Sequence, residues 1–95
     1  MQSTATIKTA KAERYLAQLC KHFCRKVPAA FESSVGWVDL PMGRADLEAS
    51  NQVLTVKLEG EDGDKLTQLE EIMQCHLERF AFREDLTVVW RRKNS

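Results

Sequence analysis

Apolar side chains in residues 10–27 recur every three or four positions, which places them on one face of an α-helix. They are Ala12, Tyr15, Leu16, Leu19, Cys20, Phe23 and Val27. Thr9 is the expected N-cap, and Pro28 ends the helix because the residue before a proline disfavours helical conformation. The same spacing predicts a second helix that opens with the acidic segment 60–64 and ends near Phe80. Its stripe is Leu66, Leu69, Ile72, Met73, His76, Leu77 and Phe80.

Alternation of apolar and polar residues predicts strands elsewhere in the chain. The clearest example is residues 53–59, and shorter strands are expected at 4–8, 29–32, 35–40, 44–49 and 86–91. Turn-forming residues at 33–34, 41–43 and 50–51 separate the four middle strands into a meander. The order β-α-β-meander-α-β predicts an α+β fold. We expect a two-layer sandwich, with both helices on one face of a mostly antiparallel sheet, formed by residues 1–95 as a single domain.

Composition narrows the class of protein. A chain of 95 residues with 43% apolar and 29% charged residues is typical of one globular domain. Basic and acidic residues balance at 14 each, so no nucleic-acid partner is expected. The apolar runs are far shorter than the roughly 20 residues of a membrane span, and the N-terminus does not resemble a secretion signal. Three cysteines, an odd number, suit a reducing compartment. We therefore expect a cytoplasmic protein without a membrane partner.

Charge is nevertheless segregated along the chain. Residues 8–28 contain six basic side chains and one acidic one, whereas residues 59–78 contain seven acidic side chains and one basic one. Two interpretations are open. The two helices lie side by side and attract each other, or the basic helix binds an anionic partner.

The two histidines are the most informative polar residues. His76 lies within the apolar stripe of the second helix, and His22 lies at the boundary of the first stripe, one turn before Lys26. In one interpretation His76 is a core residue bonded to the backbone and His22 is a surface residue. In the other, both histidines and Lys26 line one pocket. A metal site is not expected, because His22 projects away from Cys20 and Cys24. No cofactor and no catalytic residue is assigned.

The sheet face away from the helices is a candidate contact surface. It is expected to carry Val35, Trp37, Val53 and Val89 among charged and polar side chains. Apolar residues on an open sheet face often mark an interface. The sequence therefore predicts a homodimer through this face, in which a twofold contact buries the same residues on both chains.

Two stretches carry a resemblance that spans nearly the whole chain. One is RYLAQLCKHF at residues 14–23, followed by KVP at 26–28, and the other is HLERFAFRE at residues 76–84, which leads into the strand containing Trp90. Together they resemble a small bacterial domain family of unknown function. Its members occur as stand-alone proteins, or attached to and encoded near siderophore-interacting and siderophore-uptake proteins. The resemblance implies an association with iron-siderophore handling. It draws attention, as ligand-binding candidates, to His22, Lys26, His76, Arg79, Arg83 and Glu84.

Three functions follow from these observations. The first is a non-enzymatic cytoplasmic accessory domain that binds a small anionic ligand or a siderophore-related protein. The second is a small enzyme that acts on an iron chelate or an anionic small molecule, with His22 and His76 as acid and base. The third is a structural interaction module that uses the face around Trp37. Convergence of the histidines with Lys26 favours the first two, whereas a solvated His22 and an enclosed His76 favour the third.

Overall fold

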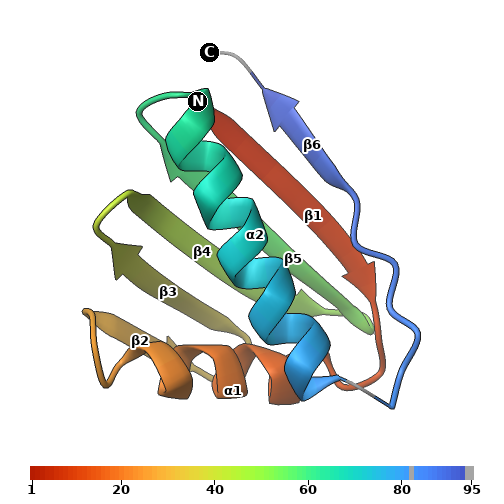
Figure 1. Ribbon diagram of the computed structural model, residues 1–95. Coiled ribbons are helices and arrows are strands. Elements are labelled where there is room, and N and C mark those ends of the chain that lie inside the picture. The colour runs from red at the N-terminus through yellow and green to blue at the C-terminus, as the bar shows by residue number, and fades with distance from the viewer. Residues whose placement is uncertain (82, 94–95) are drawn as a thin grey trace.

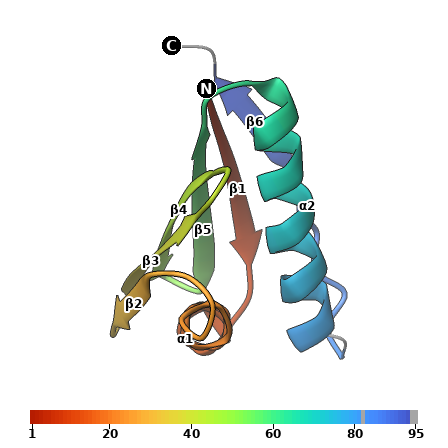
Figure 2. The same ribbon diagram turned by 60° about the vertical axis from the view of Figure 1, so that its left-hand side comes forward.

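A computed structural model of the chain describes residues 1–81 and 83–93. It has the order β1 (Gln2–Lys8), α1 (Ala12–Phe23), β2 (Ala29–Glu32), β3 (Val35–Leu40), β4 (Gly43–Ser50), β5 (Val53–Gly60), α2 (Gly63–Phe80) and β6 (Trp90–Lys93). The strands form one six-stranded antiparallel sheet in the order β2-β3-β4-β5-β1-β6. Both helices cover the same face, and the other face is left open (Figures 1 and 2). The predicted α+β fold is confirmed.

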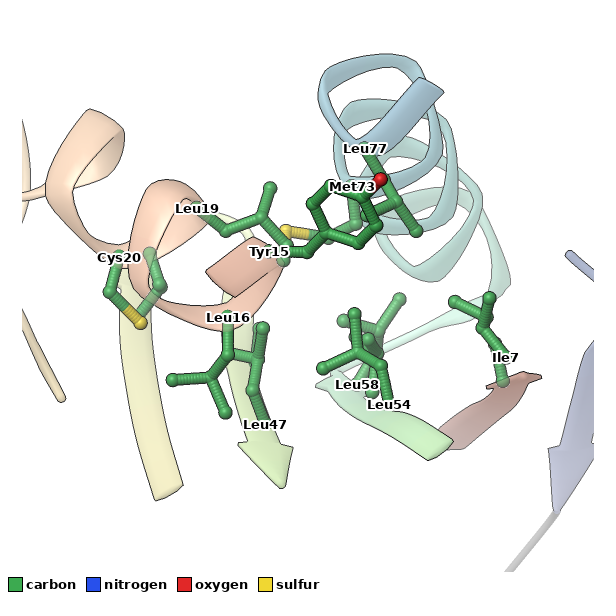
Figure 3. Close-up of a cluster of buried hydrophobic side chains, with 14 of the residues drawn as sticks. Ile7, Tyr15, Leu16, Leu19, Cys20, Leu47, Leu54, Leu58, Met73 and Leu77 are labelled. Carbon is green, nitrogen blue, oxygen red and sulfur yellow. The ribbon is translucent and has the colours of Figure 1, made fainter. Parts of the chain in front are cut away.

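The core lies between the sheet and the two helices (Figure 3). Alternate residues of the strands point inward, and the helix stripes predicted from the sequence meet them. The best buried side chains include Leu16 and Leu19 of α1, Met73 and Leu77 of α2, and Leu54 and Leu58 of β5, all at most 2% exposed. Burying each such side chain contributes about 1.5–3 kcal/mol. Among the described residues, no helix is both long and apolar enough to cross a membrane.

Gly36 on β3 allows α1 to lie close to the sheet. A Cβ at this position would come within 2.8 Å of the Cys20 Sγ and 3.1 Å of the Phe31 Cβ. Cys20 is 1% exposed, and burial raises the pKa of its thiol to about 11. Its thiol therefore stays protonated and acts as a small buried apolar group. Cys24 and Cys75 are exposed, and all three cysteines are free.

Three local predictions were wrong in detail. Helix α1 ends at Phe23 and not at Val27, because the backbone N–H groups of Lys26 and Val27 both donate to the Phe23 carbonyl, which closes the helix in a turn. The N-cap of α1 is Lys11, and the Thr9 hydroxyl instead accepts from the Lys11 N–H at 3.1 Å.

The last strand is β6, at Trp90–Lys93, and not the predicted segment 86–91. Residues 85–89 are irregular, although Leu86 and Val88 still pack against the core. The strand begins at Trp90, which pairs with Ala5 of β1. The Trp90 indole N–H also donates to the Gln74 side chain of α2 at 2.9 Å, and this bond anchors the start of the strand.

Candidate ligand-binding site

The C-terminal end of α2 meets α1, and the two helices cross instead of lying side by side (Figures 1 and 2). The interpretation that the acidic helix attracts the basic one along its length was therefore wrong. The ion pairs of α2 in this region join other residues. Glu70 of α2 binds Arg92 of β6 at 2.8 Å, and Lys65 of α2 binds Glu61, which lies just before the helix, at 2.9 Å. Where the helices meet, both contribute basic residues.

The two histidines meet at this crossing. The ring centroids of His22 and His76 are 4.7 Å apart, with the rings tilted by 52°. The ring centroid of Phe23 lies 4.9 Å from that of His76, and the ring centroid of Phe80 lies 5.9 Å from that of His22. The Nδ1 atom of His76 is 2.7 Å from the Ile72 carbonyl oxygen, one turn earlier in α2. His76 is thus bonded to the backbone, as the first interpretation expects, and it also faces His22. That both histidines line one pocket with Lys26 stays a prediction.

Cations surround this histidine pair. Partial burial lowers the pKa of His22, and positive charge from His76, Lys26, Arg25 and Arg79 lowers it further. The His22 side chain is exposed to solvent, and His76 is half-buried. His22 therefore holds a proton less readily than an ordinary histidine, and a negative charge nearby would oppose this shift of its pKa. The predicted residues Lys26 and Arg79 do lie close enough to His22 to act on it electrostatically.

A hollow of about 310 Å³ adjoins the histidine pair through Phe80. We call it the basic hollow, because three cations line it: Lys11 and Arg14 of α1, and Arg83 just after α2. The remaining lining residues are Tyr15, Gln18, Phe80 and Ala81. The basic hollow and the histidine pair together form what we call the helix-end site.

Gln18, one of the residues that line the basic hollow, also carries a buried polar atom. Its Oε1 atom is buried and accepts no hydrogen bond from any residue that the structure describes. An unpaired buried acceptor costs about 1–3 kcal/mol. A hydrogen-bond donor that reached this oxygen would recover this free energy.

Glu84 has a different place from the one expected. Its carboxylate accepts hydrogen bonds from the Tyr15 hydroxyl and, at 3.1 Å, from the Thr9 hydroxyl. These bonds tie the segment after α2 to the start of α1 and hold Arg83 at the basic hollow. Glu84 is therefore placed to position the site, and its carboxylate is already occupied by two hydroxyl donors.

Sequence reasoning found the histidine pair but missed Lys11, Arg14 and Gln18. A signal was present, since Arg14, Gln18 and His22 are spaced four residues apart and share one face of α1. What the spacing could not show was that the end of α2 would lie against this face.

Of the predicted contact residues, Val35, Trp37 and Val53 lie on the open face of the sheet, and Val89 lies in the irregular segment before β6. Val35 and Val89 are 52% and 57% exposed, whereas Trp37 and Val53 are half-buried. They do not form one apolar patch, because charged residues of β4 separate β3 from β5. A second hollow, of about 430 Å³, lies beside Trp37 and shares no lining residue with the basic hollow.

Comparison with known proteins supports the resemblance at the level of family. Residues 4–91 match the family described as an uncharacterized protein conserved in bacteria, DUF2218. The chain belongs to this family. Its fold is similar to that of PA4090 from Pseudomonas aeruginosa, solved by NMR, with a TM-score of 0.83 and 29% sequence identity. The similarity covers 99% of this chain and 98% of that one. No curated protein matches the chain.

Proposed function

We propose that this DUF2218 domain is a non-enzymatic accessory domain that binds a small oxyanion at the helix-end site. The observation that carries the proposal is the basic hollow, whose lining combines Lys11 and Arg14 with Gln18, a residue whose buried side-chain oxygen lacks a partner among the described residues. Lys11 and Arg14 give this lining a positive charge that attracts an anionic ligand.

The two features of the basic hollow specify the chemistry of the ligand. Cations such as Arg14 favour carboxylates, which accept charge-assisted hydrogen bonds from guanidinium groups. The Gln18 oxygen accepts hydrogen bonds and cannot bind a carboxylate, so a ligand that also brings a donor would pair with it. A hydroxycarboxylate has both groups. The volume of about 310 Å³ is at the small end of the range for ligand pockets, which suits a compact metabolite.

The histidine pair extends the site toward Lys26 and Arg79. A carboxylate placed near His22 would offset the positive charge that now lowers its pKa. Binding would then draw a proton onto His22 and should be tighter at mildly acidic pH.

Citrate and ferric citrate are the first ligands to test. Citrate combines three carboxylates with one hydroxyl, and its ferric complex is an iron chelate. The choice of an iron chelate rests on the resemblance to domains found with siderophore-interacting proteins. We also propose a cytoplasmic location, which the two exposed free cysteines support because a reducing compartment preserves them.

The test is calorimetric titration of the full chain with citrate and with tricarballylate, which is citrate without its hydroxyl. We expect citrate to bind more tightly, because only citrate can donate to Gln18. Gln18→Leu should bring the two ligands to the same affinity. Arg14→Gln should weaken both by about 10–100-fold, which corresponds to the roughly 1.5–3 kcal/mol of a hydrogen bond to a charged group.

The control is Lys65→Gln, which removes one positive charge at the opposite end of α2 and should leave binding unchanged. Equal binding of both ligands to the wild type, or wild-type affinity in Arg14→Gln, would contradict the proposal. NMR spectra of citrate and ferric citrate incubated with the protein report turnover. Chemical change in either ligand would replace the binding proposal with the enzymatic alternative.

A further inference from the structure

The open face of the sheet carries charge in an ordered pattern. Its outward residues on β2, β3 and β4 include four acids and one base: Glu32, Asp39, Asp46, Glu48 and Arg44. Those on β5, β1 and β6 include four bases and one acid: Lys57, Lys8, Arg91, Lys93 and Glu59. The boundary between the acidic and basic halves falls between β4 and β5, in the middle of the six strands.

A twofold contact can use this face in two ways. With the axis across the strands, each strand faces its own copy, and like charges meet. With the axis parallel to the strands between β4 and β5, β2 faces β6 of the second copy and β3 faces β1. The acidic half of each copy then covers the basic half of the other. Opposed charge of this kind guides association and disfavours the wrong arrangement.

The strand register makes this opposition specific at the centre of the face. Asp46 pairs with Lys57 across β4 and β5, and Arg44 pairs with Glu59. Because the axis preserves position along the strands, Asp46 of one copy faces Lys57 of the other, and Arg44 faces Glu59. Four opposite-charge contacts therefore lie around the axis.

In the same arrangement, the hollow beside Trp37 faces the β6 region of the second copy. It is about 430 Å³ in volume, and its lining has three acidic residues and one basic residue, Lys57, among apolar ones. The part of the lining on β2 and β3 includes Ala30, Glu32, Val35 and Trp37. These residues belong to β2 and β3, which face β6 and β1 of the second copy. Arg91 lies in the same register row as Ala30 and Trp37, and Val89 just before it is 57% exposed.

We propose that the open sheet face binds the same face of a second copy, about a twofold axis parallel to the strands between β4 and β5. Val89 and Arg91 of each copy sit in the hollow beside Trp37 of the other. Two aligned sheets pack about 10 Å apart, which lets these side chains interdigitate. The contact leaves both helices, and the helix-end site, on the outside of the dimer.

Two charge-reversal variants test this geometry by sedimentation of the full chain from micromolar to millimolar concentration. In the dimer of Asp46→Lys, two lysines oppose each other at both central contacts, and in the dimer of Lys57→Glu, two acids do so. Each variant alone should dissociate at a concentration at least about tenfold higher than the wild type, since opposed like charges cost several kcal/mol. Mixed one to one, they should form a heterodimer. One of its central contacts then joins two unchanged residues, the other joins the two substituted ones, and opposite charges meet at both.

The matched control is Glu71→Lys, an equal change of charge on an exposed position of α2, which should dimerise like the wild type. Circular dichroism of each variant checks that it is folded. A wild type that stays monomeric at millimolar concentration overturns the proposal. So does a pair of variants that remains monomeric on mixing, or variants that each dimerise like the wild type. None of these outcomes bears on citrate binding.

Discussion

The two halves of α2 differ in the charges that lie next to them. Near its N-terminal half, acidic residues meet donors from other elements: Glu70 accepts hydrogen bonds from Arg92 of β6 and from the buried Ser3 hydroxyl of β1. At its C-terminal end, His76 and Arg79 meet His22 of α1 and the cations around it. One end brings opposite charges together and the other brings like charges together.

This difference separates a structural role from a binding role. Paired charges in the N-terminal half tie the helix to β1 and β6 and stabilise the fold. Like charges at the C-terminal end oppose folding, and sites that break the general rules of stability are often functional. The comparison predicts that changes at the first end lower stability, whereas changes at the second end lower ligand affinity.

The largest effect on stability is expected from Glu70→Ala. The substitution removes the acceptor of both Arg92 and Ser3, and it leaves the fully buried Ser3 hydroxyl without that partner. We expect the free energy of unfolding, measured by urea denaturation, to fall by about 1–3 kcal/mol. Glu71→Ala, at the exposed neighbouring position, should change it by less than about 0.5 kcal/mol. Equal effects at the two positions would show that the Glu70 contacts contribute nothing.

Acid should weaken the same contacts in the wild type. Hydrogen bonds from Arg92 and Ser3, together with the Arg92 charge, hold the pKa of Glu70 below its usual value, although partial burial opposes this shift. Stability from Glu70 is thus fully present above its unfolded pKa of about 4.3 and is lost as pH falls through the lower folded pKa. Glu70→Gln should show a shallower loss of unfolding free energy below about pH 4.3 than the wild type.

His76→Leu tests whether the C-terminal end of α2 affects ligand affinity more than stability. The ring is half-buried and makes one backbone contact at 2.7 Å, so an apolar side chain of similar size should fit. We expect a loss of about 1 kcal/mol or less in unfolding free energy, with citrate affinity reduced. Urea denaturation and calorimetry on the same sample measure the two quantities. A large loss of stability with unchanged affinity would make His76 a core residue only.

A smaller effect is expected from pH acting on His22. Because its folded pKa is lowered, the unfolded chain binds a proton more readily, and stability falls as pH drops below the unfolded value of about 6.5. The melting temperature of the wild type should therefore decrease slightly because of this group as the pH falls from about 7.5 to about 5.5, a range that spans the unfolded pKa. His22→Gln should remove this part of the decrease, and saturating citrate should reduce it in the wild type.

The sequence predicted the parts of the fold that depend on periodicity. Helix α2 ends at Phe80 as expected, and the four middle strands lie within a residue of their predicted limits. The start of β6 was wrong because it depends on the Trp90 contact with Gln74, a tertiary hydrogen bond that no local pattern reveals. The end of α1 was wrong because the turn after Phe23 precedes the proline by several residues.

The site was predicted only in part for a similar reason. His76 on its apolar stripe and His22 at the boundary of the other stripe were enough to expect that they could meet, and they do. The basic hollow depends on the crossing of the helices, which brings Arg83 to the side of Arg14 and Gln18. Hydrophobic spacing determines which face of a helix is buried, but it does not determine the direction in which one helix crosses another.

The most direct test of anion binding at the helix-end site is an NMR titration of the His22 and His76 ring signals against pH, with and without saturating citrate. We predict that the pKa of His22 in the free protein lies below the ordinary histidine value, because partial burial and nearby cations lower it. Citrate should move that pKa upward, and Lys65→Gln should give the same two curves as the wild type. A His22 titration curve that citrate leaves unchanged would contradict the claim that the helix-end site binds anions.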